Sequence, residues 1–75
     1  MDMRITRFMQ ALKSVAGGDV TAEVRAVRVK EEFGEGYDEV WQLALSLSLV
    51  EWGAESGTIA LTPWGAKVLA REAAV

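Results

Sequence analysis

Cysteine and histidine are both absent from the sequence. Their absence removes the thiol nucleophile, the disulfide bond, the Cys/His zinc site and the imidazole base, and with them most enzyme mechanisms. The carboxylates that remain are not accompanied by a nucleophile, a metal-ligand set or a cofactor motif. We therefore expect that the protein is not an enzyme and that it binds no metal and no other cofactor.

Long apolar segments are absent as well. The most apolar stretch, residues 40–50, has about half of the roughly 20 residues that a membrane-spanning helix needs, and it contains a glutamine and two serines. Asp2 and Arg4 are followed by alternating apolar and charged residues, whereas a signal peptide has an uninterrupted apolar core. We therefore expect a cytoplasmic protein that does not bind the membrane.

Basic residues are absent from the middle of the chain. Residues 1–30 carry six basic and three acidic residues, whereas residues 31–62 carry seven acidic residues and no Lys or Arg. Residues 63–75 add two basic residues and one acidic residue, and the net charge of the whole chain is −3. This balance excludes the class of proteins that are held on nucleic acid by a large positive charge alone.

The length of 75 residues is enough for one domain, which spans residues 1–75. Apolar residues recur at spacings of three and four over residues 3–16, which predicts a helix there. Gly17 and Gly18 follow this segment, and glycine is the residue that most often ends a helix. The first element of the domain is therefore expected to be an amphipathic helix.

A second helix is predicted over residues 21–33, where two adjoining series of apolar residues form one wide face. The alternative is a strand, because Val24 and Val27 are β-branched, but the alternation that a strand requires breaks at this point. Gly34 and Gly36 then end the element. The spacing favours the helix.

A third helix is predicted from Tyr37 to about Leu49. Asp38 and Glu39 place acidic side chains in the first turn, where the helix dipole favours negative charge. The segment is apolar nearly all round, which predicts a helix that is buried on most sides. Residues 43–50 also alternate between leucine and smaller side chains, so a strand remains the alternative for this part.

A hairpin and a last helix follow. Val50–Trp52 and Thr58–Leu61 are short runs of strand-forming residues, and the glycine-containing segment between them is typical of a hairpin turn. Thr62 and Pro63 then predict a helix start, because the threonine hydroxyl can accept from a free amide and proline fits the first helical position. This helix is expected to run to about residue 73.

In this order of helix, helix, helix, hairpin and helix, the chain resembles the winged-helix variant of helix-turn-helix domains. The most specific part runs from Leu49 through the hairpin to Gly65, and the resemblance covers essentially the whole chain. It implies a small single-domain α+β fold in which the third helix enters the DNA major groove and the hairpin, the wing, touches the adjacent backbone. The implied function is that of a small DNA-binding regulator of transcription.

The charges depart from the DNA-binding pattern of that family. The presumed recognition helix offers only Gln42 and two serines for reading bases. Phosphate contacts would therefore have to come from the first two helices or from a dimer. The candidate nucleic-acid-binding residues are Arg4, Arg7, Arg25, Arg28 and Lys30. We place DNA binding narrowly ahead, and the alternative is a winged-helix domain that binds a protein and does not read a groove.

Aromatic and acidic groups have simpler interpretations. The three tryptophans, Trp41, Trp52 and Trp64, are expected to fill core volume rather than to stack on bases, and Trp52 is the one that we most readily expect to be exposed. The acidic residues at positions 31–39 are expected to be a solvated loop and helix start. Finally, a domain this small, with oppositely charged segments and a strongly apolar third helix, is expected to form a two-fold homodimer.

Overall fold

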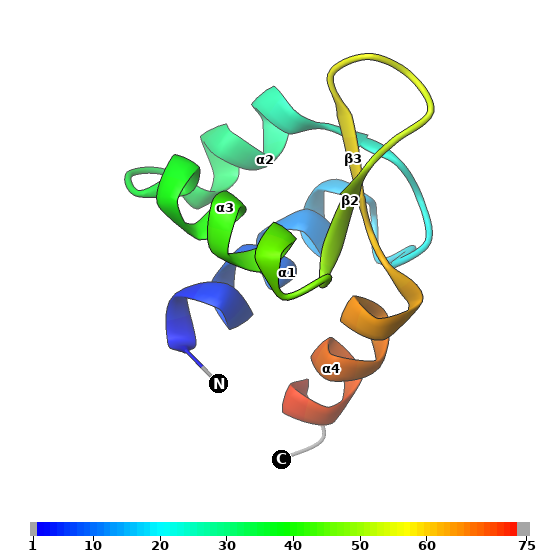
Figure 1. Ribbon diagram of the computed structural model, residues 1–75. Coiled ribbons are helices and arrows are strands. Elements are labelled where there is room, and N and C mark those ends of the chain that lie inside the picture. The colour runs from blue at the N-terminus through cyan, green and yellow to red at the C-terminus, as the bar shows by residue number, and fades with distance from the viewer. Residues whose placement is uncertain (1, 74–75) are drawn as a thin grey trace.

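Over the residues that the structure describes, the protein folds into four helices and a three-stranded antiparallel sheet (Figure 1). The structure is a computed structural model and describes residues 2–73. In chain order the elements are α1 (Met3–Val15), β1 (Val24–Arg25), α2 (Ala26–Phe33), α3 (Tyr37–Ser46), β2 (Val50–Trp52), β3 (Thr58–Leu61) and α4 (Pro63–Ala73). This is a small α+β fold, and its order of elements is compatible with a winged-helix topology.

Helix α1 begins and ends where the sequence predicts, within one residue. Asp2 caps its start, because the backbone N–H of Arg4 donates a hydrogen bond of 2.8 Å to the Asp2 carboxylate. Gly17 and Gly18 both adopt positive φ angles, of 69° and 91°, which the chain needs in order to turn away after the helix.

The prediction of a helix over residues 21–33 is wrong for its first five residues. Val24 and Arg25 form the short strand β1, which pairs with Ile59 and Thr58 of β3, and α2 begins only at Ala26. The partner strand lies more than 30 residues along the chain, so the local spacing of apolar residues could not reveal the pairing. A strand was the alternative interpretation of this region, and it is correct for these two residues.

Helix α3 is shorter than predicted. It ends at Ser46 because Ser48 adopts the left-handed conformation, with a φ of 60°, which turns the chain into β2. Residues 43–46 are helical, and the strand proposed as the alternative for residues 43–50 begins only at Val50. The first turn of α3 carries the acidic residues Asp38 and Glu39, as expected.

The predictions of one wide buried face on the second helix and of a third helix buried on most sides are wrong in part. Val27 of α2 is exposed, and so are Leu43 and Leu45 of α3 and Leu47 just after it. Only the side of α3 that carries Tyr37, Val40, Trp41 and Ala44 is buried. The helix is therefore amphipathic in burial even though it is apolar nearly all round in sequence.

The hairpin and the start of α4 are confirmed. β3 lies between β1 and β2, and Val50 of β2 pairs with Leu61 of β3. Thr62 then caps α4, since its hydroxyl oxygen accepts a 2.9 Å hydrogen bond from the N–H of Gly65. The same hydroxyl donates to the carbonyl of Ser48 at 2.6 Å, which ties the start of α4 to the turn between α3 and β2.

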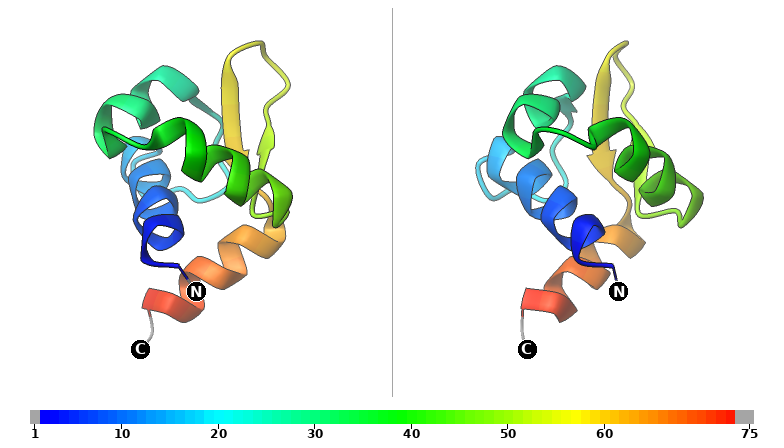
Figure 2. Two further views of the ribbon diagram at one scale, coloured as in Figure 1. Left: turned by 60° about the vertical axis from the view of Figure 1, so that its left-hand side comes forward. Right: turned by 90° about the vertical axis from the view of Figure 1, so that its left-hand side faces the viewer.

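The core is centred on Phe8 of α1, which is fully buried. Its ring centroid lies 6.0 Å from that of Phe33, 5.7 Å from that of Tyr37 and 6.2 Å from that of Trp41. These contacts join α1 to the end of α2 and to α3. In the further views, α4 lies at the end of the molecule opposite the tip of the β2–β3 hairpin (Figure 2). The tip of the hairpin therefore points away from α4.

Gly65 is needed where the first turn of α4 packs against Leu49, the residue just before β2. A Cβ atom at this position would overlap the backbone carbonyl of Leu49. Within helices, glycine to alanine normally stabilises by about 1 kcal/mol, whereas overpacking costs about 1–3 kcal/mol. We therefore expect Gly65→Ala to lower the free energy of unfolding in urea denaturation, against the propensity trend. Ala70→Gly, at an exposed position of the same helix, calibrates propensity alone. A Gly65→Ala variant more stable than the wild type would contradict this packing.

Candidate functional site

Two of the predicted nucleic-acid contacts, Arg4 and Arg7 of α1, are engaged with the protein itself. The guanidinium of Arg4 lies 3.1 Å from the carboxylate of Asp2 and 3.8 Å from that of Glu39. The guanidinium of Arg7 lies 5.4 Å from the ring centroid of Phe33, which is cation–π geometry. These side chains are exposed, but binding phosphate would compete with these contacts.

The other predicted contacts lie on or next to α2. Arg25 and Arg28 line one hollow of about 330 Å³ together with residues at the end of α1, and Arg28 also borders a second hollow beside Ser14, Glu31 and Glu32. Lys30 is exposed in the last turn of α2 and lines neither hollow. The structure thus brings Arg25 and Arg28 together.

A second surface is apolar and lies between α3 and the hairpin. Trp41 and Trp52 meet edge to face, with ring centroids 4.9 Å apart and planes at 67°. Leu45 lies one turn beyond Trp41 on α3, so the two side chains leave the same side of the helix. The exposed fractions are 8% for Trp41, 37% for Leu45 and 61% for Trp52. We call these three residues the α3–wing strip.

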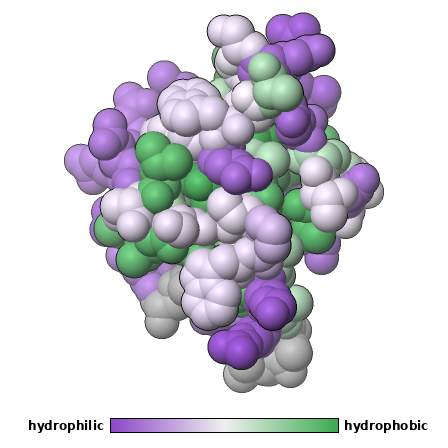
Figure 3. Space-filling view, turned by 45° about the vertical axis from the view of Figure 1, so that its right-hand side comes forward, coloured by the Kyte–Doolittle hydropathy of each residue, from purple (hydrophilic) through white to green (hydrophobic). Residues whose placement is uncertain are grey.

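Further exposed apolar residues lie near this strip. Leu43 and Leu47 form a second pair one turn apart, and Trp64 stands at the start of α4, which Thr62 ties to the end of α3. Figure 3 shows green and pale side chains across much of the centre of this face, whereas purple side chains gather at its edges and towards the hairpin tip. Trp41 fills core volume, as expected, whereas the same expectation is wrong for Trp64, which is exposed. Trp52, the tryptophan most readily expected to be exposed, is exposed.

The surroundings of the α3–wing strip are acidic. Asp38 and Glu39 lie in the first turn of α3, and Glu55 lies in the hairpin loop, all of them exposed. Residues 31–62, which include the whole of α3 and the hairpin, contain no Lys or Arg. The strip is therefore an apolar surface bordered by negative charge, which phosphate groups would meet unfavourably.

Tyr37 does not add reactive chemistry to this face. Burial raises the pKa of its phenol above the ordinary value, and the nearby Asp38 carboxylate acts in the same direction. The hydroxyl is thus held in its neutral form more firmly than a free tyrosine. Its role is to pack against Phe8.

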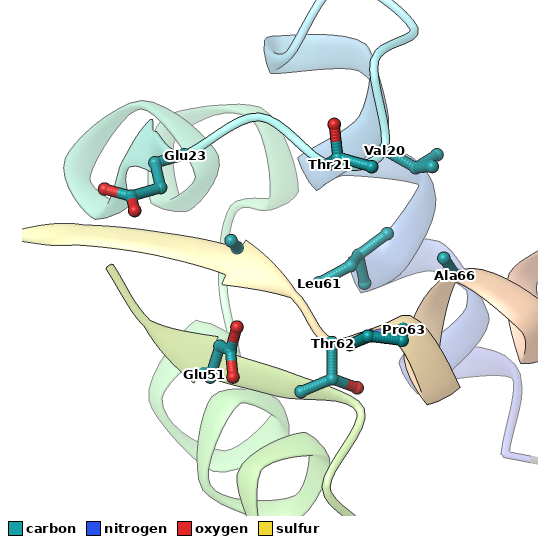
Figure 4. A pocket seen from close by; sticks show the side chains of 9 residues that line it. Val20, Thr21, Glu23, Glu51, Leu61, Thr62, Pro63 and Ala66 are labelled. Carbon is teal, nitrogen blue, oxygen red and sulfur yellow. The ribbon is translucent and has the colours of Figure 1, made fainter. Parts of the chain in front are cut away.

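Behind the sheet, a pocket of about 300 Å³ is lined by both apolar and acidic side chains (Figure 4). The carboxylates of Glu23 and Glu51 lie on either side of β3. Glu23 accepts hydrogen bonds from the N–H of Ala54 at 3.0 Å and from the hydroxyl of Thr58 at 3.2 Å. Glu23 therefore fastens the segment before β1 to the hairpin, which is a structural task.

Gly53 leaves room for this carboxylate, and a larger residue there would have to displace it. A Cβ atom on Gly53 would overlap the Thr58 hydroxyl and the Glu23 carboxylate. Sequence patterns gave no signal for this arrangement, because Glu23 and its hydrogen-bond partners lie more than 30 residues apart. The exposed strip was missed for a related reason: an apolar residue on a helix predicts burial, and only the packed structure shows which side is left open.

Neither a metal site nor a membrane span is present in the part of the chain that the structure describes. Over residues 2–73, acidic side chains form no group of three or more that could hold a metal ion. Within the same range, each helix is too short or too polar to cross a bilayer.

Comparison of the chain with protein-family models, with curated proteins and with solved structures finds no match.

The contact between Arg4 and Asp2 makes a prediction about pH. The guanidinium and the backbone N–H of Arg4 both donate to the Asp2 carboxylate and lower its pKa below the ordinary value. This interaction stabilises the start of α1 above the ordinary aspartate pKa and is lost as the pH falls through the lowered one. We expect Arg4→Gln to raise the pKa of Asp2, measured by carboxyl carbon NMR titration. Lys13→Gln, in the last turn of the same helix, should leave it unchanged. An Asp2 titration midpoint insensitive to Arg4 would contradict the contact.

Proposed function

We propose that the chain is a small winged-helix domain, not an enzyme, that binds another protein through the α3–wing strip. The observation that carries the proposal is the largely exposed indole of Trp52, which is held by Trp41 beside Leu45. The winged-helix assignment is supported by the order of the elements and by the position of β1 beside the hairpin.

Exposed apolar surface of this composition is typical of protein interfaces. Contiguous exposed apolar patches on small proteins mark interaction sites, and tryptophan is among the residues most enriched at the energetic centre of an interface. Trp52 is fixed in orientation by its contact with Trp41, so little side-chain entropy would be lost when a partner covers it. These properties favour a protein ligand for this face.

The same face is poorly suited to DNA, although DNA binding led the expectations from the sequence. A recognition helix needs base-reading side chains and phosphate contacts that set its register. α3 presents Gln42 between acidic and apolar neighbours, and no cation lies anywhere from residue 31 to residue 62. Bringing this surface to duplex DNA would place carboxylates against phosphates, which is repulsive. The charge distribution therefore supports the protein-binding function.

Cross-linking at the strip tests the proposal. We expect benzoylphenylalanine in place of Trp52 to form covalent adducts with a protein when the chain is made in its native cells. The same group in place of Val27, an exposed apolar residue of α2, serves as the control and should not form these adducts. Adding Leu45→Ser should reduce the adducts at position 52, because it removes apolar contact area. Equal adducts from both positions, or adducts with nucleic acid only, would refute the proposal.

Duplex DNA is the second candidate ligand, and the observation that favours it is the pair Arg25 and Arg28, which line one hollow and are both exposed. If DNA binds there, Arg25→Ala with Arg28→Ala should reduce affinity and lower the log-log salt slope by about one per lost phosphate contact. Gln42→Ala should have no effect. The measurement is fluorescence anisotropy with random duplex DNA over a salt series. Absence of binding at low salt counts against this candidate, whereas loss of binding in Gln42→Ala would show that α3 reads bases.

A further inference from the structure

We infer that the α3–wing strip recognises a basic segment of its partner, one in which Arg or Lys side chains stand next to apolar ones. The inference rests on the proposed function, because it names the chemistry of the ligand for the same surface. Two independent features carry it: the sign of the charge that α3 and the hairpin contribute, and the largely exposed side chain of Trp52.

The charged side chains that α3 and the hairpin contribute are all acidic, and the ion pair that Arg4 of α1 makes with α3 involves Glu39. Asp38 lies in the first turn of α3, two turns before Leu45 and on the same side of the helix, and Glu55 lies in the hairpin loop that follows Trp52. No Lys or Arg of residues 31–62 neutralises these carboxylates. A partner with acidic side chains would be repelled from this face, whereas a basic one would be attracted and oriented. Among the partners that could bind the apolar strip, these carboxylates therefore favour those with basic side chains.

The second feature is Trp52. Its ring is met by Trp41 edge to face, and 61% of the residue remains exposed. The face of an indole attracts cations through its quadrupole, and arginine is the most frequent partner in such contacts. The protein itself already uses this interaction between the exposed Arg7 of α1 and the ring of Phe33. Trp52 offers the same interaction to a guanidinium from outside, next to the apolar surface of Leu45.

A second copy of the chain fits this face less well. A two-fold contact through the strip would bring the carboxylates of Asp38 and Glu55, the acidic residues nearest the strip on α3 and the hairpin loop, close to the same carboxylates of the second copy. Like charges that face each other across an interface cost several kcal/mol. The homodimer expected from the sequence remains a prediction, and it would need a different face.

The test uses three short fluorescent peptides with leucines at the same positions, spaced by three and four. All remaining positions are Arg in the first peptide, Gln in the second and Glu in the third. Fluorescence anisotropy with the full chain should show the Leu/Arg peptide binding about tenfold or more tightly than the Leu/Glu peptide, with the difference shrinking in high salt. Trp52→Ala should weaken Leu/Arg binding by about tenfold or more. Trp64→Ala, which removes an exposed tryptophan outside the strip, is the matched control and should have no effect.

The charge contribution is measured separately. Asp38→Asn combined with Glu55→Gln should weaken Leu/Arg binding by about twofold to tenfold and leave Leu/Gln binding unchanged, in line with the strength of exposed ion pairs. The control pair, Glu31→Gln with Glu72→Gln, removes the same charge elsewhere and should not change either affinity. Leu45→Ser provides a second strip variant, and circular dichroism checks that every variant is folded.

The outcomes separate the inference from the proposed function. Equal binding of all three peptides, lost in Trp52→Ala, would overturn the basic preference and leave protein binding at the strip intact. The inference would also be overturned if the affinity for the Leu/Arg peptide were unchanged in Trp52→Ala and in the Asp38→Asn, Glu55→Gln pair, or if no peptide bound. Cross-linking at position 52 tests the proposed function independently of these peptides. A dimer in analytical ultracentrifugation that Trp52→Ala dissolves would also overturn it, because a second copy would then occupy the strip.

Discussion

The fold depends on the burial of Phe8. This ring contacts the last residue of α2, the first residue of α3 and the next turn of α3. Helix α1 thereby sets the angle between the two helices that follow it, because each of them must bring an aromatic side chain to the same point. A chain of 75 residues has little core volume, so a single fully buried phenylalanine with three aromatic neighbours accounts for a large part of what holds the helices together.

The α3–wing strip is connected to this aromatic core through Trp41. Trp41 contacts Phe8 on one side and Trp52 on the other, so aromatic contacts lead without a break from the centre of the domain to the exposed hairpin. The hairpin is fixed from its other side by the hydrogen bonds of Glu23 to Ala54 and Thr58. Trp52 is therefore exposed on a supported strand rather than on a free loop. A surface held in this way loses little conformational entropy when a partner covers it.

The elements that the sequence predicted well are those with a local cause. Helix α1 follows from its apolar spacing and the glycines after it, and α4 follows from Thr62 and Pro63, whose capping the structure confirms. The hairpin follows from strand-forming residues around a glycine-rich turn. The errors arose where residues far apart in the chain set the secondary structure. Val24 and Arg25 form a strand because they pair with β3, and α3 ends early because Ser48 turns the chain into β2, which pairs with the same strand.

For the binding surface, the sequence by itself determined the charge. Residues 31–62 are acidic and free of cations in any fold, because charge is a property of composition. Only the tertiary structure decided which apolar residues reach solvent, since α3 is apolar nearly all round and its buried side is chosen by where α1 and the hairpin pack against it. It likewise brought Trp52 onto Trp41 and separated Arg4 and Arg7 from Arg25 and Arg28. Burial and proximity are set by contacts between segments far apart in the chain, and periodicity within one segment carries no information about them.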